Sequence, residues 1–396
     1  MGLASSEEQI SLNGIVTWAE IDLDAIAFNI RAFMRHVGEK VKVIAVVKAN
    51  AYGHGAAPVA ESALKAGAGM LAVHRMSEGV ELRKAGIEAP ILIMGYTPPD
   101  GAELTAEWKL TPSLMTLEFA QALASRATAL GTSIPVHIKV DSGMNRYGLM
   151  PEEVAAFLQA MAGLPGIEME GLFTHFATAD WADQSNARQQ LRVFSDVRAA
   201  AHLAGFDFPM AHAANSAAMM TLPESHFDAV RTGIAMYGMD PSSEWSPPFE
   251  IRPALTLKSI VSRVRRLPAG AGVSYGRTFV TSRPTLAALV PVGYGDGFHR
   301  VLSNQGSVLI NGRRAPILGR VCMDQIVVDA SGIPDVKQDD EVVLVGKQGK
   351  DRIRAEEVAK LAGTINYEVT TGLLPRVTRL YYQDRTLVSV DSITGK

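Results

Sequence analysis

The chain has 396 residues, more than one small domain needs and enough for two sizeable hydrophobic cores. Its formal net charge is −3, so the composition gives no indication of a nucleic-acid-binding surface. Cys322 is the only cysteine, which excludes internal disulfides and cysteine-based metal clusters. The sequence contains neither an apolar stretch of the roughly 18 residues that span a bilayer nor a secretory signal. We therefore expect a cytoplasmic protein that binds neither nucleic acid nor membrane.

Short apolar strands alternate with amphipathic helical patterns between about residues 42 and 232. Helical patterns separate nearly all of these strands. The eight predicted strand segments are 41–49, 70–75, 91–96, 110–115, 134–143, 169–177, 209–216 and 227–233. Such alternation is typical of parallel strands joined by crossover helices, and eight strands predict a closed (β/α)8 barrel, the TIM-barrel type of α/β fold.

The pattern changes near residue 240, where the Pro- and Ser-rich stretch 239–253 indicates a domain boundary. Beyond it, strands follow one another without long helices between them, at 256–267, 285–294, 306–330 and 340–346. This pattern predicts a mainly antiparallel β domain. We therefore expect a barrel domain over residues 12–250 and a β domain over 251–396. The pattern leaves open whether residues 1–11 pack on the β domain.

Catalytic groups of such barrels lie at the carboxyl ends of the strands. The first strand is an unbroken apolar run that ends in Lys48, whose amine either points into water or is buried and neutral. Further polar residues and one glycine follow this strand and the later ones: Tyr52, Lys139, Asp141, Arg146, His175, Asn215, Ser216, Arg231 and Gly233. A neutral lysine beside groups able to hold a phosphate indicates a Schiff base with a phosphorylated carbonyl compound or cofactor.

Two other patterns are not expected to form functional sites. His175 and His212 lack the spacing of a helix-borne metal site, and a single histidine is most often structural, so we expect no metal. The glycine-rich stretches 269–276 and 293–297 have no following helix. They are therefore predicted to be turns rather than dinucleotide-binding loops.

Nine short motifs together resemble bacterial alanine racemase. The match runs in order from about residue 18 to 380, and the motifs read VVKANAYGHG, VDSGMNRYG, FTHFATAD, ANSAA, VRTGIAMYG, VSYGRTF, VGYGDG, RVCMDQ and NYEV. Each motif is weak alone, but their order and spacing across both predicted domains are specific. The resemblance implies a racemase that interconverts L- and D-alanine with pyridoxal 5′-phosphate (PLP) and supplies D-alanine for peptidoglycan. It also implies a homodimer with active sites shared between subunits.

The resemblance assigns roles to individual residues. Lys48 would bind PLP covalently and act as the base on one face of the α-carbon, and Tyr275 of the other subunit would act on the opposite face. Arg231 would face the pyridine nitrogen and, unlike a carboxylate, leave it unprotonated. The other cofactor-binding residues would be Tyr52, His175, Asn215, Ser216, Gly233, Ile234 and Tyr367.

The remaining roles concern the substrate. Arg146 would orient the substrate carboxylate, and the backbone N–H of Met323 would contact it. Lys139 matches a position that is often carbamylated, which would brace Arg146. Asp324 would support the site, and Tyr294 would help to narrow an entry channel that admits a methyl side chain and resists larger ones.

Four alternatives stay open. A PLP-dependent amino-acid decarboxylase shares the plan of barrel and β domain but carries an acidic residue where Arg231 stands. A non-catalytic PLP carrier resembles the barrel alone, and a barrel aldolase acting on a sugar phosphate through Lys48 leaves the second domain unexplained. Within the family, the alternative is a racemase of broader specificity or one that prefers serine, although the size of Tyr367 favours alanine.

Overall fold

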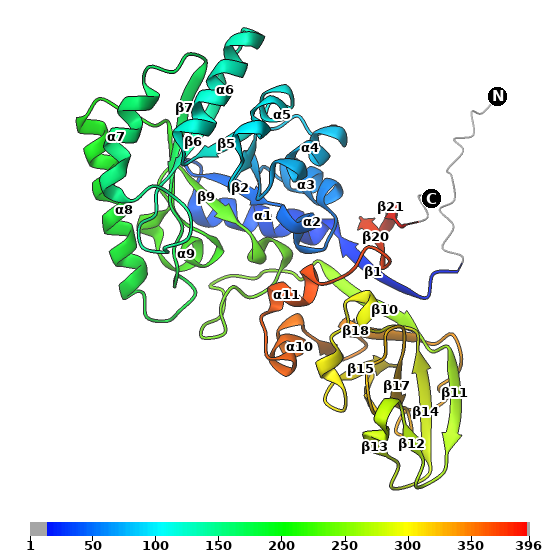
Figure 1. Ribbon diagram of the computed structural model, residues 1–396. Helices are drawn as coiled ribbons and strands as arrows, with labels where there is room; N and C mark the ends of the chain where they lie inside the picture. The colour runs from blue at the N-terminus through cyan, green and yellow to red at the C-terminus, as the bar shows by residue number, and fades with distance from the viewer. Residues whose placement is uncertain (1–13, 394–396) are drawn as a thin grey trace, which may run out of the picture. The chain divides into compact units, whose positions relative to one another are not determined.

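The computed structural model describes residues 14–393, which form two compact units (Figure 1). One unit is Ala25–Arg252, and the other combines the described residues up to Asp24 with those from Pro253 onward. We expected the barrel domain to begin at residue 12, whereas the barrel unit of the structure begins at Ala25. Strand β1, Thr17–Asp22, lies between β10 and β20 of the second unit and pairs with both. Where residues 1–11 pack is a question outside the described residues.

Eight parallel strands form the sheet of the first unit, in the order β8-β7-β6-β5-β4-β3-β2-β9. Backbone hydrogen bonds from Asp228 N to Ala211 O and from Arg231 N to Ala214 O join the two ends of this order. The sheet therefore closes, which confirms the predicted (β/α)8 barrel. Its strands are β2 (Lys42–Val46), β3 (Met70–Val73), β4 (Ile91–Ile93), β5 (Thr111–Leu114), β6 (Ile134–Lys139), β7 (Ile167–Phe173), β8 (Met210–His212) and β9 (Ala229–Thr232).

Helices alternate with these strands and surround them (Figure 1). They are α1 (Leu23–Val37), α2 (Lys48–Tyr52), α3 (Ala56–Lys65), α4 (Met76–Lys84), α5 (Ala102–Glu107), α6 (Leu117–Leu130), α7 (Pro151–Met161), α8 (Ser185–Leu203) and α9 (Ser216–Thr221). The sequence pattern did not predict α5, because its six residues are too few for a clear helical period. Within residues 14–393, no helix is both long and apolar enough to cross a membrane.

The apolar runs of the barrel strands follow from burial on both faces. In β2 every residue except Lys42 is buried, and β3 is buried throughout. A parallel strand covered by helices outside and by side chains inside needs apolar residues at successive positions. Burying one such aliphatic side chain contributes about 1.5–3 kcal/mol. These strands therefore form a stable core whose carboxyl ends can carry polar groups.

The second unit is mainly antiparallel, as predicted. Its largest sheet has the order β16-β15-β18-β10-β1-β20-β21, and among the described strands of this sheet β1 and β20 form the one parallel pair. Two smaller sheets are β11-β14-β17 and β12-β13. The strands are β10 (Leu255–Ile260), β11 (Arg263–Leu267), β12 (Gly272–Val273), β13 (Phe279–Val280), β14 (Thr285–Val290), β15 (Ser307–Ile310), β16 (Arg313–Pro316), β17 (Ile326–Asp329), β18 (Glu341–Gln348), β19 (Asp351–Ile353), β20 (Thr378–Gln383) and β21 (Thr386–Asp391), with helices α10 (Ala355–Ala362) and α11 (Asn366–Thr371).

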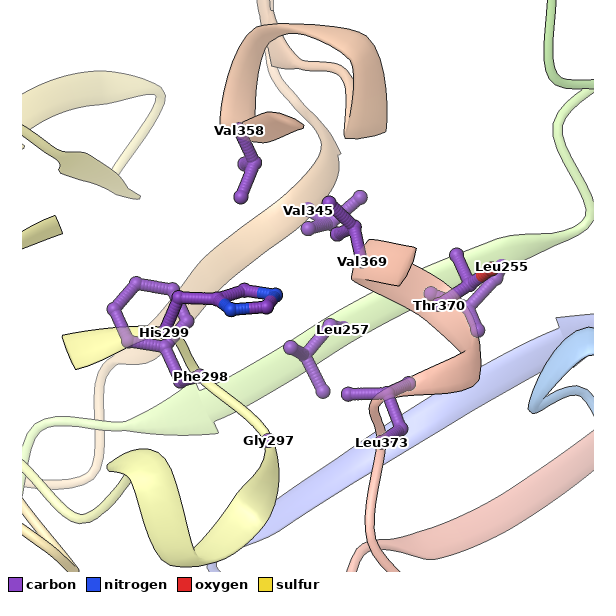
Figure 2. A pocket seen from close by; sticks show the side chains of 10 residues that line it. All are labelled: Leu255, Leu257, Gly297, Phe298, His299, Val345, Val358, Val369, Thr370 and Leu373. Carbon is purple, nitrogen blue, oxygen red and sulfur yellow. The ribbon is translucent and has the colours of Figure 1, made fainter. Parts of the chain in front are cut away.

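A small apolar cavity lies in the β unit (Figure 2). Leu257 of β10 and Val369 of α11 line it, together with Leu373. His299 Nε2 and Thr370 Oγ1 are buried beside it without a hydrogen-bond partner. Of the described residues that line the cavity, His299 alone carries a titratable side chain. The cavity therefore lacks the converging polar groups of an active site.

Candidate active site

Lys48 lies just beyond β2, where the backbone forms a turn of left-handed helix. Ala49, Asn50, Ala51 and Tyr52 have φ between 51° and 53°. This conformation costs an L-residue about 1–2 kcal/mol, because Cβ approaches the following carbonyl oxygen. The strain is located where Lys48 and Tyr52 leave the barrel strand, so the surrounding structure has to stabilise the turn.

Glu78 of α4 supplies part of that stabilisation. Its carboxylate accepts hydrogen bonds from the backbone N–H of Ala49 at 2.6 Å and from those of His74 and Arg75 at 2.8 Å each. It therefore connects the left-handed turn to the loop after β3. Our sequence analysis missed Glu78, because an acidic residue in the first turn of a helix usually indicates only a cap.

Four cationic side chains gather at the strand ends of the barrel: Lys48, Lys139, Arg146 and Arg231. Burial, and then the positive charge of Arg146, lowers the pKa of Lys48. Burial also lowers the pKa of Lys139 to about 7, with further effects from Arg231, Arg146 and Lys48. Lys139 Nζ donates to the Met94 carbonyl at 3.1 Å. Burial and the neighbouring positive charges thus shift both lysine amines toward the neutral form.

The loop after β6 positions Arg146. The Asp141 carboxylate accepts hydrogen bonds from four successive backbone N–H groups, those of residues 143–146, at 2.8–3.0 Å. The loop curls around this carboxylate. Arg146 then lines one cavity with Lys139 and His175. The structure thus brings these predicted site residues together.

Arg231 is buried in the barrel and satisfied by backbone and imidazole acceptors. It donates to the carbonyls of Thr174, His212 and Ala213 at 2.7, 3.1 and 2.9 Å. It also donates to His175 Nδ1 at 3.3 Å. Burial lowers the pKa of Arg231 to about 9, which leaves it a cation at neutral pH. Burial, and then the Arg231 charge, lowers the pKa of His175 well below its usual range, which favours a neutral ring. Because a guanidinium group only donates, His175 Nδ1 is the acceptor and the ring hydrogen is assigned to Nε2.

A polar cluster of hydroxyl and backbone groups forms where α9 and β9 meet. Ser216 Oγ accepts hydrogen bonds from the backbone N–H of Gly233 at 2.9 Å and of Ala235 at 3.4 Å. A side chain at position 233 would place its Cβ only 2.6 Å from the Tyr52 hydroxyl oxygen. Glycine is therefore required at 233 if Tyr52 is to approach the backbone this closely.

Asn215 and Ile234 flank this polar cluster. The Asn215 side chain accepts a hydrogen bond from Ala218 N at 2.9 Å and so caps α9. Ile234 is buried and begins the short 3-10 turn Ile234–Tyr237. The Asn215 side chain thus has a visible structural role, in addition to the cofactor contact predicted from the sequence.

Residues predicted for the site also gather within the β unit. Tyr294 N donates to the Cys322 carbonyl at 3.1 Å, and Ser274 Oγ donates to the Arg320 carbonyl at 2.7 Å. These bonds join three motifs that are distant in the sequence. The predicted residues in the joined segments are Tyr275, Tyr294, Met323 and Asp324. Tyr275 is 74% exposed and Met323 53% exposed, so they form an accessible surface of this unit.

Arg376 braces one end of that surface. It forms ion pairs with Asp324 at 2.8 Å and with Asp296 at 2.7 Å. Tyr367 lies on α11 and is half-buried. Within the described range 14–393, no three His, Cys, Asp or Glu side chains are arranged to hold a metal ion.

A lysine and buried cations at the carboxyl ends of a closed (β/α)8 barrel, followed by an antiparallel β unit, define a two-domain barrel enzyme. Comparison with protein families is more specific. Residues 21–241 match the family described as "Alanine racemase, N-terminal domain" and residues 254–381 match "Alanine racemase, C-terminal domain". The chain belongs to the alanine racemase family, and it is an amino-acid racemase, an isomerase.

Individual relatives of the chain are also alanine racemases. The alanine racemase of Halothermothrix orenii is 45% identical over 365 residues, which cover 92% of this chain and 96% of that protein. That of Symbiobacterium thermophilum is 47% identical, with 92% and 97% covered. The crystal structure of alanine racemase from Bacillus anthracis with bound L-Ala-P has a TM-score of 0.92 and 39% identity, and covers 97% of this chain and 99% of that one.

Proposed function

We propose that the chain interconverts L- and D-alanine with bound PLP, using Lys48 and Tyr275 as two bases. The observation that carries this proposal is the Lys48 amine at the barrel mouth, half-buried and lowered in pKa by burial and by Arg146. Such an amine is neutral in a larger fraction of molecules than a surface lysine, so it can both attack a carbonyl and accept a proton.

The residues present fit PLP. Position 233 has no room for a Cβ beside the Tyr52 hydroxyl. Together with Ser216 Oγ and the backbone N–H groups of Gly233 and Ile234, this hydroxyl forms a polar cluster that suits a phosphate dianion. Lys48 would hold the aldehyde end and Arg231 would face the ring nitrogen. When bound, PLP supplies the electron sink that allows the α-proton of an amino acid to leave.

Arg231 distinguishes racemisation from the reactions of related enzymes. It is a buried cation held by three backbone carbonyls, so it can donate a hydrogen bond to the ring nitrogen but not accept one. It therefore favours an unprotonated pyridine nitrogen and makes PLP a weaker electron sink. A weaker electron sink limits side reactions such as transamination. A decarboxylase of similar plan would carry a carboxylate at this position.

Tyr275 acts from the partner subunit of a homodimer. Racemisation needs a proton removed on one face of the α-carbon and returned on the other, so the second base has to approach from the side opposite Lys48. Tyr275 is 74% exposed and lies in the surface that also contains Met323. An exposed catalytic tyrosine is expected where the active site is completed by a second copy of the chain.

Lys139 carries a carbamate that braces Arg146. An amine with a pKa of about 7 is largely neutral in mildly alkaline solution and adds CO2 at nitrogen. The nitrogen loses a proton in this reaction, and an anionic carbamate replaces a cationic amine. Two neighbouring guanidinium groups, those of Arg146 and Arg231, stabilise the anion.

Alanine fits this site better than larger amino acids do. Tyr367 and Tyr294 narrow the entry, although discrimination against one extra methylene is worth only about 1–3 kcal/mol, so some turnover of serine or 2-aminobutyrate is expected. The relatives support a small substrate, since structures hold L-Ala-P in the Bacillus anthracis enzyme and cycloserine in the Clostridium difficile enzyme. The product D-alanine would serve peptidoglycan synthesis in the cytoplasm.

Isotope exchange tests the proposal directly. The purified, PLP-loaded protein is incubated with L-alanine in D2O, and optical activity and α-deuterium are followed together. Loss of optical activity with deuterium at the α-carbon is the expected result. Exchange with serine but not alanine would overturn the substrate, and absence of exchange with any amino acid would overturn racemisation.

A further inference from the structure

A chain of hydrogen bonds runs through the barrel core from Arg231 to Glu170. Arg231 NH1 lies 2.6 Å from His212 Nδ1. His212 Nε2 lies 2.8 Å from His137 Nδ1, and His137 Nε2 lies 3.3 Å from Glu170 Oε2. The four residues come from the four successive strands β6 to β9, which are neighbours in the closed barrel. Nothing in the proposed reaction explains Glu170 or the two imidazoles.

The hydrogen-bonded side chains are buried except at the Glu170 end, which is partly exposed to solvent. His137 and His212 have no exposed surface, and Arg231 is 3% exposed. The Glu170 side chain is 30% exposed. A buried imidazole pair is costly unless each nitrogen has a partner, and here each of the four ring nitrogens has one.

The two end groups determine where every hydrogen lies. A guanidinium group only donates, so His212 Nδ1 accepts and its hydrogen is on Nε2. That hydrogen is donated to His137 Nδ1, which places the His137 hydrogen on Nε2, from where it is donated to Glu170. A carboxylate only accepts, so every hydrogen bond from Arg231 to Glu170 can form with both imidazoles neutral. Burial lowers the pKa values of both imidazoles, in agreement with neutral rings.

Packing holds the rings in this arrangement. His212 stacks on Phe173, with ring centroids 4.8 Å apart and an interplanar angle of 10°. The His137 ring lies against β7 at Gly171, where a Cβ would come within 2.4 Å of His137 Nδ1. The glycine therefore makes room for the His137 imidazole at this position.

We propose that Glu170, His137 and His212 form a positioning relay, which fixes the orientation and donor pattern of Arg231 from the far side of the barrel core. The inference rests on the proposed function, in which Arg231 faces the ring nitrogen of PLP. The relay keeps His212 Nδ1 as an acceptor, so one N–H of Arg231 stays engaged there in addition to the bonds to three backbone carbonyls. Loss of the Glu170 charge frees the imidazoles to exchange hydrogens, and His212 then competes with Arg231 as a donor.

Glu170→Gln in the PLP-loaded enzyme tests the relay, with Glu168→Gln on the same strand as the control. Glu168 is exposed and makes none of the hydrogen bonds between Arg231 and Glu170. Nitrogen-15 NMR of histidine-labelled protein reports which ring nitrogen carries hydrogen. In the wild type and in E168Q we expect His137 and His212 to be neutral with hydrogen on Nε2, and in E170Q we expect this pattern to be lost or mixed.

The second readout is the cofactor itself. In E170Q the visible absorption band of bound PLP should shift and kcat should fall about tenfold, as happens when outer partners of a metal ligand are removed. Wild-type imidazoles with hydrogen on Nδ1, or an E170Q variant with unchanged nitrogen signals and absorption, would overturn the relay. A wild type without racemisation would contradict the proposed function instead, and the nitrogen signals would still decide whether the relay exists.

Discussion

The amine of Lys48 differs from those of surface lysines in its surroundings. It follows a buried strand, begins a left-handed turn and is lowered in pKa by burial and by Arg146. By contrast, Lys65 on α3 is exposed and pairs with Glu61. The chemistry expected of Lys48 therefore comes from its position in the barrel.

Lys48→Ala should abolish the visible absorbance of covalently bound PLP and reduce racemisation by about 10²–10⁴-fold or more, because the variant loses both the attachment point and a base. Spectrophotometry and polarimetry measure the two effects. Lys65→Ala is the matched control and should behave like the wild type. Retained activity in Lys48→Ala would remove this lysine from the mechanism.

Tyr275→Phe should slow α-proton exchange by about 10²–10⁴-fold for one enantiomer and leave PLP bound, because phenylalanine keeps the ring but has no acidic oxygen. Deuterium uptake from D2O, measured separately with L- and D-alanine, gives the answer. Tyr96→Phe, at a residue 51% exposed in the barrel unit, serves as control. Normal exchange of both enantiomers would rule out the two-base scheme.

Carbamylation of Lys139 can be detected with 13C-labelled bicarbonate. The free amine has a pKa of about 7, so its neutral, reactive fraction increases as pH rises through that value. At constant dissolved CO2, the 13C NMR signal of a carbamate should therefore increase between about pH 6 and 8. Lys139→Ala should lose the signal and Lys84→Ala should keep it. A wild type without such a signal would show that Arg146 is braced differently.

At the scale of elements, the strained feature is the left-handed turn over residues 49–52. Four successive non-glycine residues with positive φ are unfavourable by themselves. Glu78 offsets part of this cost through hydrogen bonds to three backbone N–H groups. The turn holds Lys48 and Tyr52 at its two ends, so its geometry sets the distance between the groups proposed for the aldehyde and the phosphate of PLP.

Glu78→Ala should lower the free energy of unfolding by about 1–3 kcal/mol, because three backbone N–H groups lose a charged acceptor. It should also weaken PLP binding, since the turn is then free to relax. Urea denaturation and PLP titration measure these changes. Glu81→Ala, an exposed residue on the same helix, should change neither, and equal behaviour of the two variants would show that Glu78 does not hold the turn.

At the scale of the whole molecule, the β unit is discontinuous in sequence. Strand β1 comes from the amino-terminal part of the chain, yet it lies inside the largest sheet, antiparallel to β10 and parallel to β20. Ser259 Oγ also donates to the Val16 carbonyl at 2.8 Å. The second unit therefore needs this early segment in order to complete its sheet.

Deletion of residues 1–22 should unfold or loosen the β unit, because β10 and β20 each lose a ladder of backbone hydrogen bonds worth about 1 kcal/mol apiece. Limited proteolysis and circular dichroism would detect the loss. Deletion of residues 1–13 is the control, as it leaves every described contact in place. Equal stability of the two truncated proteins would show that β1 is dispensable.

The sequence by itself was sufficient for the barrel, the mainly antiparallel β unit and the residues at the strand ends. These features depend on local periodicity and on burial of whole strands, which a single sequence displays. Lys48, Lys139 and His175 were found because polar residues directly after apolar runs are visible in the sequence.

Only the tertiary structure decided which groups act on one another. The sequence does not indicate that Glu78 holds the turn after Lys48, that β1 belongs to the β unit, or that Glu170 connects to Arg231 through two histidines. These relations depend on closing the barrel and pairing strands that are distant along the chain. The pKa values of Lys48 and Lys139 likewise depend on desolvation and on neighbouring cations, which exist only after the chain has folded.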